Sequence, residues 1–202
     1  MSSAIRDVGE TLIQLLRARL VVLVPSLNPA QITLVSPAKS SRGDARLTLF
    51  LYSVSPTPEL RNEMEIPGNT ADDEPVSLPL NLYYLMTAFS PLADSTDNSL
   101  DAQWLLGHAM RVFFENGTLA GSVLQGGLPP DEELRLTLQP HTLEDLSRIW
   151  SVLPETVLTA SVSYLVAPVR LRSTLTRGGQ RVISRQTDAD HAVPVHAEVL
   201  SP

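Results

Sequence analysis

Residues 47–54 read Leu-Thr-Leu-Phe-Leu-Tyr-Ser-Val, and this stretch decides the fold class. It is rich in apolar and aromatic residues with almost nothing polar, which is typical of a central strand covered on both faces. Pro56 and Pro58 end it. A second long strand is predicted from Leu80 to Phe89, with side chains alternating between two faces. Between the two, residues 62–78 are acidic and turn-rich, which predicts a surface loop.

Helical and strand patterns continue on either side of this pair. Apolar residues recur at helical spacing in three segments, each with a stop signal. We predict helices from residue 5 to Pro25, from the caps at 94–99 to Asn116-Gly117, and from Thr142, with Asp145 completing a capping box, to Pro154. Alternating or apolar runs predict three further strands, at 32–35 as a short edge strand, at 134–139, and at 157–166.

This order of elements predicts an α+β fold. A single domain is expected, with a central mixed β-sheet and helices packed on it. Residues 1–170 form the predicted domain, and residues 171–202 form a polar C-terminal extension. In that extension Gly178-Gly179 could turn a hairpin between 169–176 and 180–184, followed by a flexible tail.

Composition excludes several classes of function. The 202 residues include no cysteine, which removes thiol catalysis, disulfides and Cys-ligated metals. A net charge of −7 argues against a duplex-DNA binder and predicts no nucleic-acid partner. No run approaches the roughly 20 apolar residues of a membrane span, so direct membrane insertion is not expected. The N-terminus lacks the order of a signal peptide, which predicts cytoplasmic synthesis and assembly.

A search for chemistry finds no recognisable site. The histidines at 108, 141, 191 and 196 share no metal-ligand spacing. No Gly-x-Ser-x-Gly elbow and no phosphate-binding Gly-rich loop occurs. We therefore predict no catalytic, cofactor-binding or metal-binding residue, and a protein that is not an enzyme.

One charge cluster lies near the C-terminus. It comprises five arginines, namely Arg170, Arg172, Arg177, Arg181 and Arg185. On a hairpin Arg170 and Arg172 would point to the same face. The cluster either protects an edge strand against aggregation or forms an arm that docks on an acidic neighbouring subunit. Both interpretations remain open.

Residues 47–62 also carry a resemblance to a known family. The chain there reads Leu-Thr-Leu-Phe-Leu-Tyr-Ser-Val-Ser-Pro-Thr-Pro-Glu-Leu-Arg-Asn. This resembles the hallmark segment of the tail-terminator (cap) family of extracellular contractile injection systems, the phage-tail-like particles of the antifeeding-prophage and virulence-cassette type. Similar segments follow in the same order at 80–87, at 105–110, and at 143–150 with Tyr164. The resemblance spans about residues 5–170.

The resemblance implies a phage tail-terminator-like fold and a structural role. Members form a hexameric ring on the last rings of inner tube and sheath, end their polymerisation, and can be released as part of an extracellular particle. The implied partners are further copies of the same chain, the sheath subunits and the inner-tube subunits, and no cofactor is implied. Glu59, Arg61 and Asn62 follow a proline turn; they either satisfy backbone groups of that turn or make an intersubunit or sheath contact.

Other functions remain as alternatives. The first is a neck, adaptor or baseplate component of the same particle. The second is a small cytosolic hydrolase or ligand-binding domain, which would need a polar constellation in a pocket. The third is a nucleic-acid binder that uses the arginine arm, which predicts strongly salt-dependent DNA binding.

Overall fold

The chain folds around a six-stranded mixed sheet, seen here in a computed structural model that describes residues 3–58, 77–154 and 156–172. In chain order the elements are α1 (Ala4–Leu23), η1 (Pro29–Gln31), β1 (Ile32–Thr33), α2 (Lys39–Arg42), β2 (Leu47–Pro56), β3 (Ser77–Ala88), α3 (Ser95–Glu115), β4 (Thr118–Ala120), η3 (Gly121–Val123), β5 (Glu133–Gln139), α4 (Leu143–Ser151) and β6 (Ser161–Arg172). The strand order is β1-β2-β3-β6-β5-β4. The β1–β2 pair is parallel and the other pairs are antiparallel.

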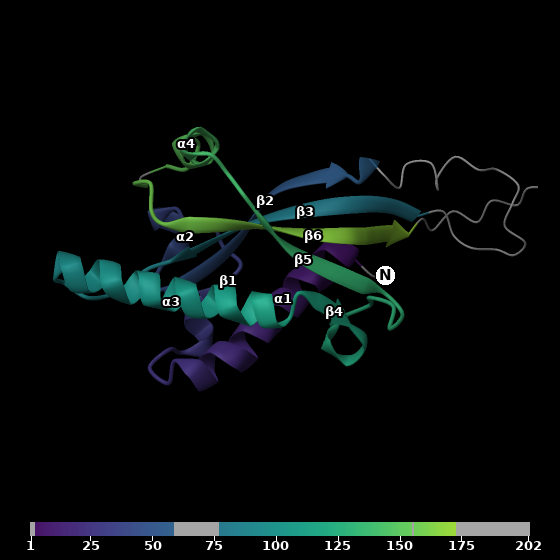
Figure 1. Ribbon diagram of the computed structural model, residues 1–202, viewed down its shortest axis with the longest axis horizontal. Helices are drawn as coiled ribbons and strands as arrows, with labels where there is room; N and C mark the ends of the chain where they lie inside the picture. Colours follow the sequence, from purple (N-terminus) through teal and green to yellow (C-terminus); the bar gives the residue numbers. More distant parts are fainter. Residues whose placement is uncertain (1–2, 59–76, 155, 173–202) are drawn as a thin grey trace, which may run out of the picture.

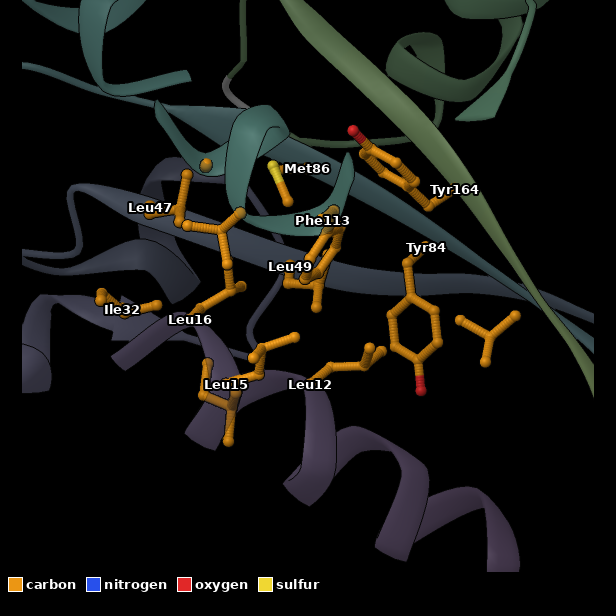
Figure 2. Packing of buried hydrophobic residues seen from close by; sticks show 14 of the residues in the cluster. Leu12, Leu15, Leu16, Ile32, Leu47, Leu49, Tyr84, Met86, Phe113 and Tyr164 are labelled. Atoms are coloured by element: carbon orange, nitrogen blue, oxygen red, sulfur yellow. The ribbon is translucent and has the colours of Figure 1, made fainter. Parts of the chain in front are cut away.

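The helices divide between the two faces of the sheet. Figure 1 shows α1 and α3 along one side and α4 on the other. The core lies between the first pair and the sheet, where the α1 side chains Leu12 and Leu16 are fully buried. On α3 the Phe113 ring meets Tyr164 of β6 edge to face, with ring centroids 4.9 Å apart. Figure 2 shows these side chains converging on Leu49 and Tyr84 of the sheet.

The prediction for residues 47–54 is partly wrong. They form β2 as expected, but β3 and β6 are the central strands. Leu47 and Leu49 are fully buried, whereas Val54 is 44% exposed. The reason is that β1 is only two residues long and pairs with β2 only at Leu47 and Thr48, so the second half of β2 has a free outer edge within the described residues.

The predicted strand at 157–166 is displaced along the chain. Strand β6 begins at Ser161 and continues through Pro168 to Arg172. A register shift opposite Asn81 accommodates the proline, which cannot donate to the ladder. Residues 169–172 pair with β3. The rest of the predicted hairpin lies outside the described residues, and the domain boundary at residue 170 stays a prediction.

The observed helices match the helices predicted from the sequence more closely than the strands do. Helix α4 opens with the predicted capping box, in which the Thr142 hydroxyl accepts from the Asp145 N–H at 3.2 Å and Asp145 Oδ2 accepts from the Thr142 N–H at 3.1 Å. Ser3 is the N-cap residue of α1, but its side chain makes no capping hydrogen bond. The acidic loop predicted at 62–78 lies largely outside the described residues, and β3 already begins at Ser77. Within the described ranges, no helix is long and apolar enough to cross a membrane.

Candidate assembly surface

Helix α3 exposes an apolar stripe on its outer face. Leu100 is 58% exposed, Trp104 48% and Phe114 87%. With Gly107 and Arg111 these residues recur at intervals of four and three, which places them on one face of a helix. We call this set the α3 stripe. It lies opposite the buried face of the same helix, formed by Leu105, Leu106, Ala109, Val112 and Phe113.

The geometry of the α3 stripe favours a close contact with another protein. Large exposed apolar side chains grouped on one face commonly mark an interaction site. Gly107 lies in the middle, and a Cβ placed there would meet no atom within 4 Å. Arg111 pairs with Glu115 at 2.6 Å, both largely solvent-exposed. The stripe therefore combines apolar side chains at both ends with one charged side chain, Arg111, between Gly107 and Phe114.

A second set of exposed apolar residues lies at the two ends of α4 and in the segment that follows it. It consists of Leu143, Val152, Val157 and Leu158, which are 72%, 77%, 81% and 45% exposed. We call this set the α4 patch. Helix α4 itself lies on the other side of the sheet from α3 (Figure 1).

Helix α4 is anchored to the sheet by polar contacts. Trp150 is buried, and its Nε1–H donates to Ser161 Oγ at 3.3 Å. The Tyr52 hydroxyl lies 3.0 Å from His141 Nε2 and 2.9 Å from Ser163 Oγ. Burial raises the pKa of Tyr52 above 10.0, although the Ser163 hydrogen bond acts in the opposite direction. Hydrogen bonds to the sheet therefore fix the position of the helix to which the α4 patch belongs.

The sequence-predicted interface residues are only partly described. Glu59, Arg61, Asn62, Arg177 and Arg181 lie outside the described residues. Their assignment to an interface stays a prediction.

Arg170 and Arg172 end strand β6, pairing with Pro79 and Ser77 of β3. On the opposite side, the β5–β6 pairing begins only at Arg135 and Ala167, so the end of β6 extends past β5. There the Arg170 N–H donates to Glu132 Oε1 at 3.1 Å, and this carboxylate takes the place of a neighbouring strand. The two arginines thus lie at a sheet margin, as both sequence interpretations require, and neither is decided.

The described residues offer little for metal or acid–base chemistry. Across residues 3–58, 77–154 and 156–172, no group of three or more His, Asp or Glu side chains could hold a metal ion. His108 packs edge to face on Trp104 with ring centroids 4.6 Å apart. His141 contacts Tyr52 as described above. His141 is thus accounted for by hydrogen bonding, whereas His108 is held by packing and its buried Nδ1 has no hydrogen-bond partner among the described residues.

Most of the chain matches a known protein family. The family model described as the Pvc16 N-terminal domain matches residues 7–185, most of the chain. The chain belongs to this family. No match was found among curated proteins. The α+β fold and the resemblance to tail terminators predicted from sequence are both confirmed.

Two solved structures share the fold of this Pvc16 N-terminal domain. The first is the sheath/tube terminator of an extracellular contractile injection system, PVC, in its extended state; it has 19% identity and a TM-score of 0.61, over 96% of this chain and 65% of that one. The second is the tube-terminating cap of the anti-feeding prophage, with 17% identity and a TM-score of 0.54, over 90% of this chain and 60% of that one. The chain thus spans less than two thirds of the length of either relative.

The α3 stripe and the α4 patch were not predicted as sites from the sequence. Leu100, Trp104 and Phe114 were assigned to a helix together with the core residues. Their angular position around the helix axis separates them from the core residues, because they lie on the side of the helix opposite Leu105 and Phe113.

Proposed function

We propose that this chain is a structural subunit of a contractile injection system that forms a ring at the distal end of the inner tube and sheath and ends their polymerisation. The observation that carries the proposal is the fold match over nearly the whole chain to two terminators, one of sheath and tube and one of the tube. The role requires binding to protein subunits and needs no nucleophile or cofactor. It is a non-enzymatic role.

The exposed surfaces support assembly through unlike faces. A cyclic ring closes when one surface of each copy contacts a different surface of the next. The α3 stripe and the α4 patch supply exposed apolar side chains for two such surfaces, and the helices α3 and α4 lie on opposite sides of the sheet (Figure 1). We propose a homohexamer assembled in the cytoplasm, in which the two sets contribute to contacts between copies or with sheath and tube. Glu59, Arg61, Asn62 and the arginines at 170, 172, 177 and 181 belong to the same proposal.

The place of this subunit on the injection particle tests the proposal. Antibody labelling of intact particles under the electron microscope should mark one end of each particle, opposite the baseplate. Native mass spectrometry of the purified chain should show a species of six copies. A strictly monomeric chain at every concentration, alone and with tube and sheath subunits, would contradict the ring.

A neck, adaptor or baseplate role in the same particle is the alternative. It predicts label at the baseplate or at an internal position of the particle. A small ligand-binding domain is less well supported, because the two hollows found in the described part of the chain are partly open to solvent and lined about equally by polar and apolar groups.

A further inference from the structure

Two adjoining hollows lie where β2 begins and β3 ends, with volumes of about 330 and 390 Å³. Arg42 of α2, Phe89 and Ser90 line both of them. The first hollow is closed on its other sides by the start of α3 and by residues 159–160, which lead into β6. Three parts of the chain that are distant in sequence thus surround one arginine.

The Arg42 guanidinium is held in place but has no polar partner in the described ranges. Its central carbon lies 3.9 Å from the centroid of the Phe89 ring, a cation–π contact that fixes the plane of the group. No ion pair or hydrogen bond within residues 3–58, 77–154 and 156–172 involves its side chain, and its Nε atom is buried without an acceptor. The Nε of the nearby Arg46 is likewise buried without an acceptor, but Arg46 pairs through Nη2 with Asp101 at 2.5 Å, whereas Arg42 has no ion pair among the described residues.

The surroundings of Arg42 suit an anionic acceptor. In the first hollow it is the one charged residue of the lining, which otherwise offers the neutral polar side chains of Ser90, Asn98, Ser99, Gln103 and Thr159. A buried donor without a partner costs free energy, and a guanidinium presents up to five donors in a planar fork. An acceptor that enters the hollow would remove this cost.

We propose that this hollow binds a single carboxylate, presented by an Asp or Glu side chain of the next copy of this chain. A carboxylate is planar and matches the guanidinium fork bidentately, and its single negative charge balances the single positive charge of Arg42. A phosphate dianion would keep an uncompensated charge beside this one arginine. The sequence supplies carboxylates that could accept such a contact, with 22 acidic against 15 basic residues. The choice of a second copy rests on the ring proposed above.

The carboxylate site is tested first without any assembly. Acetate is titrated into the purified full chain while the main-chain N–H signals of Phe89 and Ser90, which line the hollow, are followed by NMR. A saturable shift is expected, with a dissociation constant on the order of 10–100 mM, and it should vanish in Arg42→Gln. Arg42→Lys keeps the charge but loses the fork, and it should weaken acetate binding several-fold. Absence of a saturable shift, or tighter Arg42-dependent binding of inorganic phosphate than of acetate, would overturn the assignment.

The source of the carboxylate is tested separately by ring formation. Arg42→Gln should raise the concentration at which copies associate by about tenfold, the effect of losing one partly buried charge-assisted contact. Arg19→Gln, which removes an exposed arginine on α1, should leave that concentration unchanged. Acetate binding together with unaltered association of Arg42→Gln would overturn the second copy as the source. Failure of the unmodified chain to associate would instead count against the ring itself and leave the acetate result standing.

Discussion

The Asp7 carboxylate in α1 accepts a hydrogen bond of 3.1 Å from the main-chain N–H of Gly127, 120 residues later in the chain. One helical turn on, the Thr11 hydroxyl donates to the Asp7 carbonyl at 2.8 Å and accepts from the Gln125 N–H at 2.9 Å. These bonds hold the segment after η3 against the first helix. They give hydrogen-bond partners to the main-chain N–H groups of residues 125 and 127, which lie outside helices and strands.

Gly126→Ala should destabilise the protein by about 2 kcal/mol. Gly126 has φ of +69°, which L side chains rarely adopt, and a Cβ there would collide with the Asp7 carboxylate. Urea unfolding measures the loss. Gly121→Ala is the matched control, because Gly121 has a similar φ of +60° but open space around its Cβ position. An equal loss in both variants would show that the Asp7 contact contributes nothing.

Asp101→Asn should cost about 2 kcal/mol of stability, because it leaves a buried guanidinium without its anionic partner. Asp101 Oδ2 lies 2.5 Å from Arg46 Nη2, and the two side chains are 24% and 10% exposed. The pair links the start of β2 to α3. Thermal unfolding compares it with Glu144→Gln, which breaks the exposed Glu144–Arg148 pair of α4 and should change stability by less than about 0.5 kcal/mol. Equal effects would contradict a specific role for Asp101.

Stability should fall steeply above about pH 10. Burial raises the pKa of Tyr84, and likewise that of Tyr52 and Tyr164, above 10.0. Between the unfolded and folded pKa values the unfolded chain has lost protons that the folded chain retains, so the free energy of unfolding falls as pH rises. Below pH 10 this contribution is complete and constant. Urea midpoints from pH 8 to 11 should decline less in Tyr84→Phe than in the parent, and identical slopes would contradict the burial of this phenol.

Trp104→Ser combined with Phe114→Ser should impair assembly and leave the folded monomer intact. Both side chains are largely exposed, so their removal opens no cavity in the core. If the α3 stripe is an interface, losing two aromatic anchors should weaken association by at least about a hundredfold. Sedimentation velocity measures the association. Val22→Ser, at a residue of α1 that is 78% exposed, is the control and should associate normally.

The sequence predicted which helices and strands form better than it predicted which of them lie next to one another. Helix α1 and the capping box at Thr142 follow from local spacing and cap chemistry, and both are confirmed. The prediction that β2 is a central strand was wrong, because an apolar run does not reveal how long the strand paired with it is. Strand β4 and helix α2 were missed, since they are short and lie among turn residues. Their existence depends on tertiary contacts, such as the pairing of Leu119 with Leu134.

The candidate surfaces were less predictable than the fold. Whether Phe114 is a core or a surface residue depends on where α3 meets the sheet, and the sequence alone gives only its helical angle. Arg42 was not singled out at all, because its significance comes from Phe89 and the α3 start, brought together only by folding. Such long-range juxtapositions leave no local pattern.

Particle length is the most direct measurement of the proposed role. Electron microscopy would compare particles produced with this subunit, without it, and with the subunit restored. We expect uniform lengths with the subunit and, in its absence, tubes or sheaths of uncontrolled length or none that persist. Particles of normal and uniform length in its absence would contradict the assignment as a terminator.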